Sequence, residues 1–227
     1  IRSADILIEN FRPGVMERLD LSFEKLQTIN PKLVYGAIRG FGDPRSGGSP
    51  YMDWPSYDVV AQAMGGVINL TGENPEKVAK VGPGIGDIFS GLFLSFGVIA
   101  ALRDAESTGI GQFVDISMYD AMISLCERAV YQYDIEGKIP RAVGNSHPFL
   151  APFGIFPASD GKVAIGVVED RFWVALVNAI GFSEFAKNEK FSTLLARKKN
   201  IREVNELVGA WTSRFSKKEL LDRLGGI

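Results

Sequence analysis

The sequence predicts an α/β domain with a parallel sheet, followed by a smaller α+β region. Residues 4–38 show a strand, helix and strand in succession, the arrangement of a βαβ unit. After Gly137 the chain becomes rich in Gly, Pro, Asn and Ser, and patterns of a hairpin and amphipathic helices follow. A chain of 227 residues is long enough for one large and one small domain.

The opening βαβ unit is predicted element by element. The apolar run over 4–9 predicts a short buried strand, and a short helix follows over 15–19. Ser22 is suited to cap a second helix that ends at Ile29, before an Asn-Pro pair. The run over 33–38 predicts the next strand.

The rest of the first half alternates loops and helices. Residues 40–55 form a long loop rich in Gly and Pro, and such loops are usually functional or disordered. An uncharged apolar run of 15 residues, 88–102, falls short of the roughly 20 residues that cross a membrane, so we expect a buried helix there. The remaining predictions are helices over 57–69, 88–103 and 118–136 and a strand over 113–118.

The second half is predicted to be a separate, smaller region. Strands over 153–157 and 162–168 flank Ser159-Asp160-Gly161, a turn sequence typical of a hairpin. We therefore expect a large domain over 1–136, a linker and substrate loop over 137–151, and a small domain over 152–227. The amphipathic patterns predict helices over 169–180, 200–214 and 217–224.

Composition excludes several kinds of chemistry. The chain has one histidine, His147, and one cysteine, Cys126, so it holds no disulfide framework and no Cys/His zinc cluster of its own, and we predict no metal site. A net charge of −2 gives no electrostatic signature of nucleic-acid binding. Catalysis must therefore rest mainly on carboxylates, hydroxyls, amides and backbone dipoles.

Asp120 is the candidate nucleophile. It lies where a predicted strand passes into a helix, so the helix dipole would keep its carboxylate ionised. Ligands of open α/β sheets bind at such strand ends, and an ionised Asp can attack a carbonyl carbon. The alternative is a first-turn acid that only stabilises the helix. Asp115, five residues earlier, is expected to face solvent.

Other polar positions have both functional and structural interpretations. Tyr57 and Asp58 follow the Gly/Pro loop and could orient a substrate carbonyl or cap the helix. The turn over 82–87 opens a helix but lacks the GxGxxG pattern, so it is a weak phosphate signal. His147 lies in a loop without a nucleophile motif, which favours a substrate contact or a surface residue, and Cys126 is expected to be a buried structural thiol.

Four motifs together resemble the family III CoA-transferases, also called the CaiB/BaiF family. They occur in the family's order and spacing: Ala4–Gly14 (ADILIENFRPG), Tyr57–Gly66 (YDVVAQAMGG), Gly86-Asp87, and Thr108–Gln112 running into Met118–Ala121 (MYDA). The resemblance implies a Rossmann-like large domain, a smaller domain and an interlocked homodimer. It also implies a cytoplasmic protein of which this chain, beginning at Ile1, is an internal portion.

The resemblance further implies a mechanism and a set of site residues. Asp120 would attack an acyl-CoA thioester, and an aspartyl anhydride and an aspartyl-CoA thioester would follow before a carboxylic acid takes up CoA. Coenzyme A is then a substrate and no cofactor is permanently bound; neither nucleic acid nor membrane is an expected partner. The implied CoA contacts are Asn10, Phe11, Arg12, Arg18, Ser56, Tyr57 and Asp58, and the implied substrate loop is Gly144, Asn145, Ser146 and His147.

Two alternatives and a substrate hypothesis remain open. An α-methylacyl-CoA racemase would carry a His where Tyr57 stands, together with the Asp matching Asp120, and tyrosine with a pKa of about 10 is a poor base. A non-catalytic acyl-CoA-binding paralogue is the other alternative. Pro55 replaces a Lys of some formyl-CoA-transferring relatives, which argues against oxalate. The polar side chains of Arg141, Asn145 and His147 could meet a second carboxylate, as in succinate or mesaconate.

Overall fold

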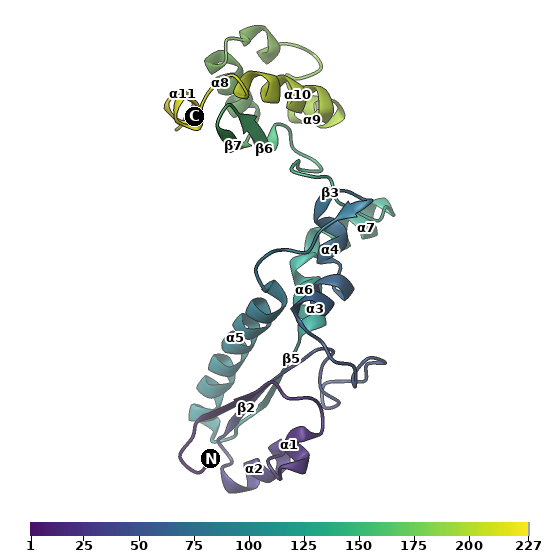
Figure 1. Cartoon of the computed structure of the whole chain (residues 1–227). Helices are drawn as coiled ribbons and strands as arrows, with labels where there is room; N and C mark the ends of the chain where they lie inside the picture. Colours follow the sequence, from purple (N-terminus) through teal and green to yellow (C-terminus); the bar gives the residue numbers. More distant parts are fainter. Residues whose placement is uncertain (227) are drawn as a thin grey trace. The chain divides into compact units, whose positions relative to one another are not determined.

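The computed structural model describes residues 1–226, which divide into two compact units (Figure 1). The first unit is Ile1–Ala142, and the second runs from Val143 to the end of the described chain. The boundary between them lies inside the 137–151 segment whose composition predicts a linker.

A three-stranded parallel sheet organises the first unit, in the order β1 (Ile6–Glu9), β2 (Val34–Arg39), β5 (Phe113–Ser117). Both pairings are parallel, which confirms the predicted α/β class with a parallel sheet. The central strand β2 is apolar and buried over most of its length, as expected of a strand covered on both faces. Its last residue, Arg39, stands opposite Ser117 of β5.

Helices cover the two faces of this sheet. Alternate residues of β2 point to opposite faces, so Tyr35 packs with α1 (Val15–Arg18) and α2 (Phe23–Ile29), whereas Val34 packs with α5 (Ile85–Thr108). Figure 1 shows α5 lying along β2 and β5. The predicted cap of α2 is confirmed, since Ser22 Oγ accepts a hydrogen bond from Lys25 N–H at 3.3 Å.

Helix α5 differs from the prediction in length and burial. It has 24 residues, because it begins before the uncharged run and continues until Gly109 ends it at φ 78°. Leu94 and Val98 face the sheet, but Phe96 and Ile99 are 67% and 64% exposed, so the expectation of a buried helix is wrong. By length and composition alone, it is the one helix within residues 1–226 that could cross a membrane, a test that core helices also pass.

Two predicted helices are each broken in two. The 57–69 helix becomes α3 (Asp58–Met64) and α4 (Val67–Leu70), separated where Gly66 takes φ 91°. The 118–136 helix becomes α6 (Met118–Leu125) and α7 (Glu127–Glu136), separated at Cys126. Cys126 is buried with Met122 and Val67, as predicted for a structural thiol. A short hairpin, β3 (Gly72–Asn74) and β4 (Lys77–Val78), completes the unit.

The second unit is an antiparallel hairpin packed with helices, which confirms the predicted α+β character. Strands β6 (Phe153–Ala158) and β7 (Gly161–Gly166) pair antiparallel, and Gly161 takes φ 148° in the turn. The predicted helices correspond to α8 (Asp170–Ala179), α10 (Ile201–Thr212) and α11 (Lys217–Leu224). The unpredicted elements are the short 3-10 helix η1 (Ser183–Ala186) and α9 (Leu194–Lys199).

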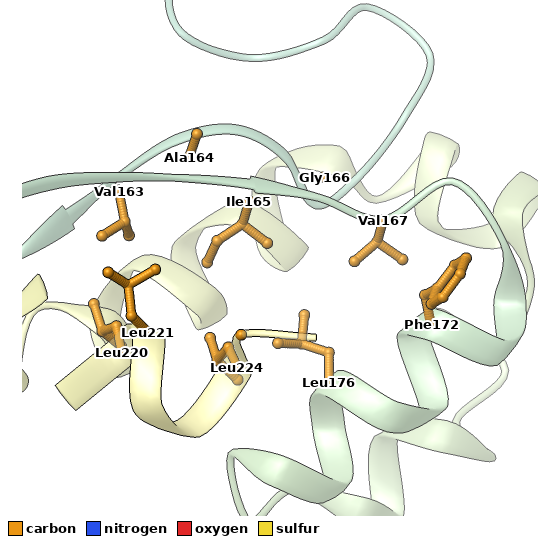
Figure 2. Close-up of a pocket in the computed structure, with 11 residues that line it drawn as sticks. Val163, Ala164, Ile165, Gly166, Val167, Phe172, Leu176, Leu220, Leu221 and Leu224 are labelled. Carbon is orange, nitrogen blue, oxygen red and sulfur yellow. The ribbon is translucent and has the colours of Figure 1, made fainter. Parts of the chain in front are cut away.

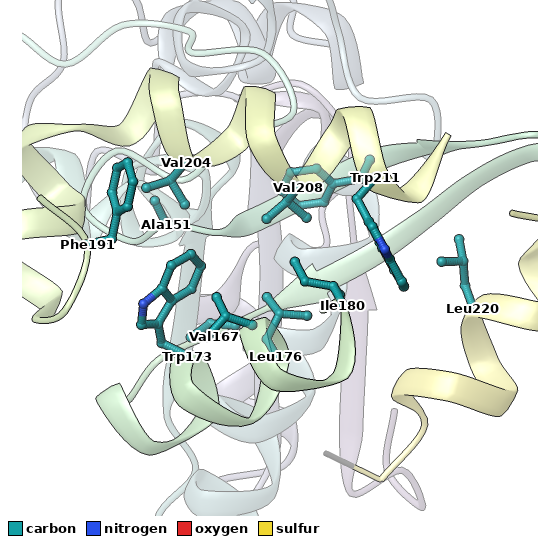
Figure 3. Packing of buried hydrophobic residues seen from close by; sticks show 12 residues of the cluster. Ala151, Val167, Trp173, Leu176, Ile180, Phe191, Val204, Val208, Trp211 and Leu220 are labelled. Atoms are coloured by element: carbon teal, nitrogen blue, oxygen red, sulfur yellow. The ribbon is translucent and has the colours of Figure 1, made fainter. Parts of the chain in front are cut away.

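The core of this unit gathers apolar side chains around Trp173, among them Val177, Val204 and Val208. Figure 3 shows Val167 and Leu176 beside Trp173. One fully buried cation lies at its edge. Arg197 donates hydrogen bonds to the carbonyl oxygens of Ala151 (2.9 Å) and Phe191 (3.0 Å) and to Asp170 Oδ1 (2.9 Å). Its burial is compatible with folding because its guanidinium is hydrogen-bonded on three sides.

Candidate active site

A hollow of about 530 Å³ lies in the first unit, where β1 and β2 end. Ligands of open parallel sheets bind at this edge. The hollow brings together five of the predicted CoA contacts, Asn10, Phe11, Arg12, Ser56 and Tyr57. The other lining residues are Pro13, Ile38, Arg39, Gly40, Met52, Trp54, Pro55, Asp87 and Met118.

A buried ion pair holds the Asn10–Arg12 loop at the rim of this hollow. Phe11 N–H donates to Glu9 Oε2 at 2.7 Å, and Arg39 Nη1 donates to the Phe11 carbonyl oxygen at 2.7 Å. Arg39 Nη2 lies 2.8 Å from Glu9 Oε1. Burial raises the pKa of Glu9, against the opposing effects of Phe11 N–H and Arg39. The sequence analysis did not predict this pair, although β1 ends at Glu9 and its neighbour β2 ends at Arg39.

The same arginine is tied to the loop that follows β2. Arg39 Nε donates to Asp43 Oδ2 at 2.8 Å, while Asp43 Oδ1 accepts hydrogen bonds from the N–H (2.9 Å) and Nη1 (3.0 Å) of Arg45. Asp43 N–H in turn donates to Asp115 Oδ2 at 2.8 Å. Asp115 was predicted to face solvent, but it lies under this loop, and burial raises its pKa. The prediction was wrong because the loop folds back over β5.

Asp58, a predicted CoA contact, is engaged inside the protein. Its Oδ1 accepts a hydrogen bond from Gly86 N–H and its Oδ2 from Gln62 Nε2, both at 2.8 Å. Gln62 is fully buried, and its Oε1 accepts from Val81 N–H at 2.9 Å. Asp58 is absent from the lining of the hollow, so in this structure it fixes the start of α5. Its contact with CoA stays a prediction.

Asp87 is the carboxylate that does line the hollow. It lies in the first turn of α5, directly after Gly86, which Asp58 holds in place. Asp58 and Asp87 lie close together, since a Cβ added to Gly84 would stand 3.7 Å from Asp58 Cγ and 3.7 Å from Asp87 Oδ2. Burial, and secondarily the negative charge of Asp58, raise the pKa of Asp87. The feature that singled out Asp120, an acid in a first helical turn, applies equally here.

Asp120 borders a different hollow. It lies in the first turn of α6, where its N–H donates to the capping Ser117 Oγ at 3.2 Å. The second hollow, of about 270 Å³, is formed with Asp115 and the loop over 41–50. The first-turn arrangement is the one that stabilises a helix. The neighbours of Asp120 reach the first hollow, since Met118 lines it and Tyr119 N–H donates to the carbonyl oxygen of Gly40, another lining residue, at 3.1 Å. The catalytic role of Asp120 stays a prediction.

Arg18 also lies outside the lining of the 530 Å³ hollow. It is exposed at the end of α1, and its Nη1 is 3.2 Å from where a Cβ on Gly14 would stand. A flexible, exposed guanidinium beside the turn that ends the Asn10–Arg12 loop can still reach a phosphate. The contact of Arg18 with CoA stays a prediction.

The predicted substrate loop belongs to the second unit. Asn145, Ser146 and His147 line a hollow of about 550 Å³, and Ser146 Oγ accepts a hydrogen bond from Asn205 Nδ2 at 3.2 Å. His147 Nδ1 accepts from the N–H groups of the residues at 149 and 150, both at 3.1 Å, so it holds a turn. Gly144 takes φ 68° at the start of this segment. The contact of this loop with substrate stays a prediction.

A further hollow of about 250 Å³ lies between β7, α8 and α11 (Figure 2). Figure 2 shows Leu176, Leu220 and Leu224 pointing toward Ile165 across it. Its lining carries no titratable side chain, so it offers nothing that would recognise a phosphate or a carboxylate.

Comparison with known proteins gives the same family from three directions. The family model described as "CoA-transferase family III" matches residues 1–226. Succinyl-CoA:mesaconate CoA-transferase of Haloarcula marismortui is 42% identical over 226 residues, 100% of this chain and 57% of that protein. Acetyl-CoA:oxalate CoA-transferase of Acetobacter aceti is 38% identical over 192 residues, 84% of this chain and 48% of that protein.

The solved structures agree with the sequence comparison. A CaiB/BaiF family protein from Brucella suis superposes with a TM-score of 0.82 and 35% identity, covering 98% of this chain and 58% of that one. The chain spans little more than half the length of the curated relatives it matches. The motifs, the parallel sheet and these similarities together show that the chain belongs to the family III CoA-transferases.

Proposed function

We propose that the protein transfers coenzyme A from an acyl-CoA thioester to a carboxylic acid, with the 530 Å³ hollow of the first unit as its CoA site. The observation that carries this proposal is the meeting, in one hollow, of the Asn10–Arg12 loop, Tyr57 and the carboxylate of Asp87. Relatives of known activity are named for CoA transfer between acids. Exchange of this kind needs a nucleophile and a bound thioester, and this hollow supplies a candidate site for the thioester.

We propose Asp120 as the nucleophile, as the Met118–Ala121 motif implies. It lies in the first turn of α6, where β5 ends, and ligands of open parallel sheets bind at this edge. Met118, two residues earlier, lines the hollow, and Tyr119 N–H donates to the carbonyl oxygen of Gly40, another lining residue. Asp87, a lining residue in the first turn of α5, is the alternative that the experiment must exclude.

The chemistry balances without an added reagent. An Asp120 oxygen attacks the thioester carbonyl carbon, the carbon–sulfur bond breaks, and a mixed anhydride and CoA thiolate form. The thiolate attacks the aspartyl carbonyl, releasing the donor acid and leaving an aspartyl-CoA thioester. The acceptor carboxylate displaces the thiolate to form a second anhydride. Attack of the thiolate on the acceptor carbonyl then gives the new acyl-CoA and restores Asp120.

For the substrates, we propose dicarboxylic acids. The support is the name of the relative at 42% identity, which acts between succinyl-CoA and mesaconate. The interlocked homodimer and the cytoplasmic location rest on the family resemblance alone. Static light scattering of the purified protein measures the first of these directly.

Trapping the intermediate tests both the activity and the residue. The protein is incubated with succinyl-CoA, quenched with hydroxylamine, and digested for mass spectrometry. We expect a hydroxamate on the peptide containing Asp120, and Asp120→Asn should lower kcat by at least about a thousandfold. The matched variant Asp87→Asn should keep kcat within about tenfold of wild type.

Each other outcome is informative. A hydroxamate on the Asp87 peptide would assign the nucleophile to that residue instead. No trapped adduct together with full activity would refute the covalent route. Deuterium exchange at C2 of a 2-methylacyl-CoA, without CoA transfer, would identify a racemase instead.

A further inference from the structure

We propose that Arg39 is a positioning residue that presets the backbone of the Asn10–Arg12 loop for coenzyme A; the inference rests on the proposed function. The three nitrogens of its guanidinium reach three different protein groups. Nη1 donates to the Phe11 carbonyl oxygen (2.7 Å), Nε donates to Asp43 Oδ2 (2.8 Å), and Nη2 pairs with Glu9 Oε1 (2.8 Å). Nothing in the sequence motifs singles out Arg39.

Burial makes Arg39 a support rather than a direct ligand. Its side chain is 3% exposed, and its donors point at protein oxygens, so the guanidinium is not free to pair with a phosphate. Glu9 completes the clamp, because its Oε2 accepts a hydrogen bond from Phe11 N–H at 2.7 Å. The backbone N–H and the carbonyl oxygen of Phe11 are thus both held by one buried ion pair.

Arg39 and the residue that follows it also help to fix the opposite wall of the hollow. Gly40, the residue after Arg39, accepts a hydrogen bond from Tyr119 N–H at 3.1 Å and lines the hollow with Ser56. Gly40 and Ser56 are in close contact, since a Cβ added to Gly40 would stand 2.3 Å from Ser56 Cβ. Asp43, anchored by Arg39, holds the loop between them near its start.

Presetting this loop should act on binding rather than on chemistry. A loop already held in its bound form loses less conformational freedom when the ligand arrives, which strengthens binding. Asp120 stands on α6, where its N–H donates to the capping Ser117 Oγ, so its position does not depend on Arg39. Loosening the clamp should therefore raise the Kd of CoA and the KM of acyl-CoA while sparing kcat and the KM of the acid.

The test compares Arg39→Lys with Arg45→Lys in the whole chain. Lysine keeps the charge at position 39 but cannot reach three acceptors at once. Arg45→Lys is the matched control, because Arg45 also pairs with Asp43 but does not line the hollow. For Arg39→Lys we expect about a tenfold rise in the Kd of free CoA by calorimetry, with kcat within about threefold. Arg45→Lys should change the Kd by less than about twofold.

Hydrogen exchange gives a second measurement that does not require activity. The peptide containing Asn10–Arg12 should exchange faster in Arg39→Lys, whereas the peptide containing Asp87 should not. If Arg39→Lys does not fold, Glu9→Gln makes the same comparison, since it removes the ion pair but keeps an acceptor for Phe11 N–H. A folded variant with unchanged Kd and exchange would overturn the inference. Failure of the wild-type protein to bind CoA would instead refute the proposed function.

Discussion

Replacing Gln62 tests whether the α3–α5 junction holds the proposed nucleophile in place. Gln62 is fully buried in α3, donates to Asp58 Oδ2 at 2.8 Å and accepts from Val81 N–H at 2.9 Å. Asp58 in turn accepts a hydrogen bond from Gly86 N–H, one residue before Asp87. Gln62 therefore connects α3 to the turn from which α5 begins.

The cost of Gln62→Leu follows from those contacts. Each lost hydrogen bond to a neutral group is worth about 1 kcal/mol, and one to a charged group about 1.5–3 kcal/mol. Asp58 and Val81 are only partly buried, so water can replace some of the loss. We expect the free energy of unfolding to fall by about 2–3 kcal/mol. We expect kcat to fall about ten- to a hundredfold, because α3 and α5 pack against α6, which carries Asp120.

The assay is urea unfolding followed by far-ultraviolet circular dichroism, with kcat measured on the same samples. A loss of 2–3 kcal/mol should lower the urea midpoint by about 1 M for the transition that contains the first unit. Gln62→Glu is the companion variant, since it keeps an acceptor for Val81 N–H but sets a second carboxylate against Asp58. Its cost should shrink as the pH falls and the introduced group is protonated. Unchanged midpoint and kcat in Gln62→Leu would refute the reasoning.

Three further predictions concern buried polar groups. Arg197→Met should destabilise the second unit by about 2–4 kcal/mol, because it leaves the carbonyl oxygens of buried Ala151 and Phe191 without their donor; a urea midpoint equal to wild type would contradict this. The raised pKa of Asp115 means that its stabilising effect is present at low pH and lost as the pH rises through the folded-state pKa. Asp115→Asn should therefore gain stability relative to wild type at pH 7 but not at pH 4, and a gain that grows toward pH 4 would count against this. Burial, and secondarily the negative charge of Glu127, raise the pKa of the buried Cys126 thiol. Iodoacetamide should therefore label this thiol only as fast as the protein opens, and rapid labelling of the folded protein would show the thiol to be accessible.

Much of the fold could be predicted because it depends on local patterns. The strands at 6–9, 34–39 and 113–117, the Ser22 cap and the hairpin turn at Gly161 all follow from periodicity and turn chemistry within a few residues. The breaks at Gly66 and Cys126 were not predicted, because an apolar pattern that continues across a break does not indicate where one helix ends and the next begins. The exposed face of α5 was missed because apolar composition does not reveal how many neighbours a helix has.

The candidate site could be predicted only in part. The motifs point to Asn10–Arg12 and Tyr57, which the structure does bring into one hollow. They point to Asp120 as the nucleophile, but they do not show that Asp87, another acid in the first turn of a helix, lines this hollow. Nor do they indicate that Asp58 is hydrogen-bonded inside the protein, since its partner Gly86 is 28 residues away.

The sequence by itself determined the family, the parallel sheet and the segments that surround the site, because motif order and short-range patterns are properties of the chain. Only the tertiary structure decided which side chains meet. Asp87 enters the hollow because α5 begins beside α3, and Arg39 joins Glu9 to Asp43 because β1 and β2 end side by side. Such meetings depend on how distant elements pack, and burial then decides which charges are held inside and which remain free to react.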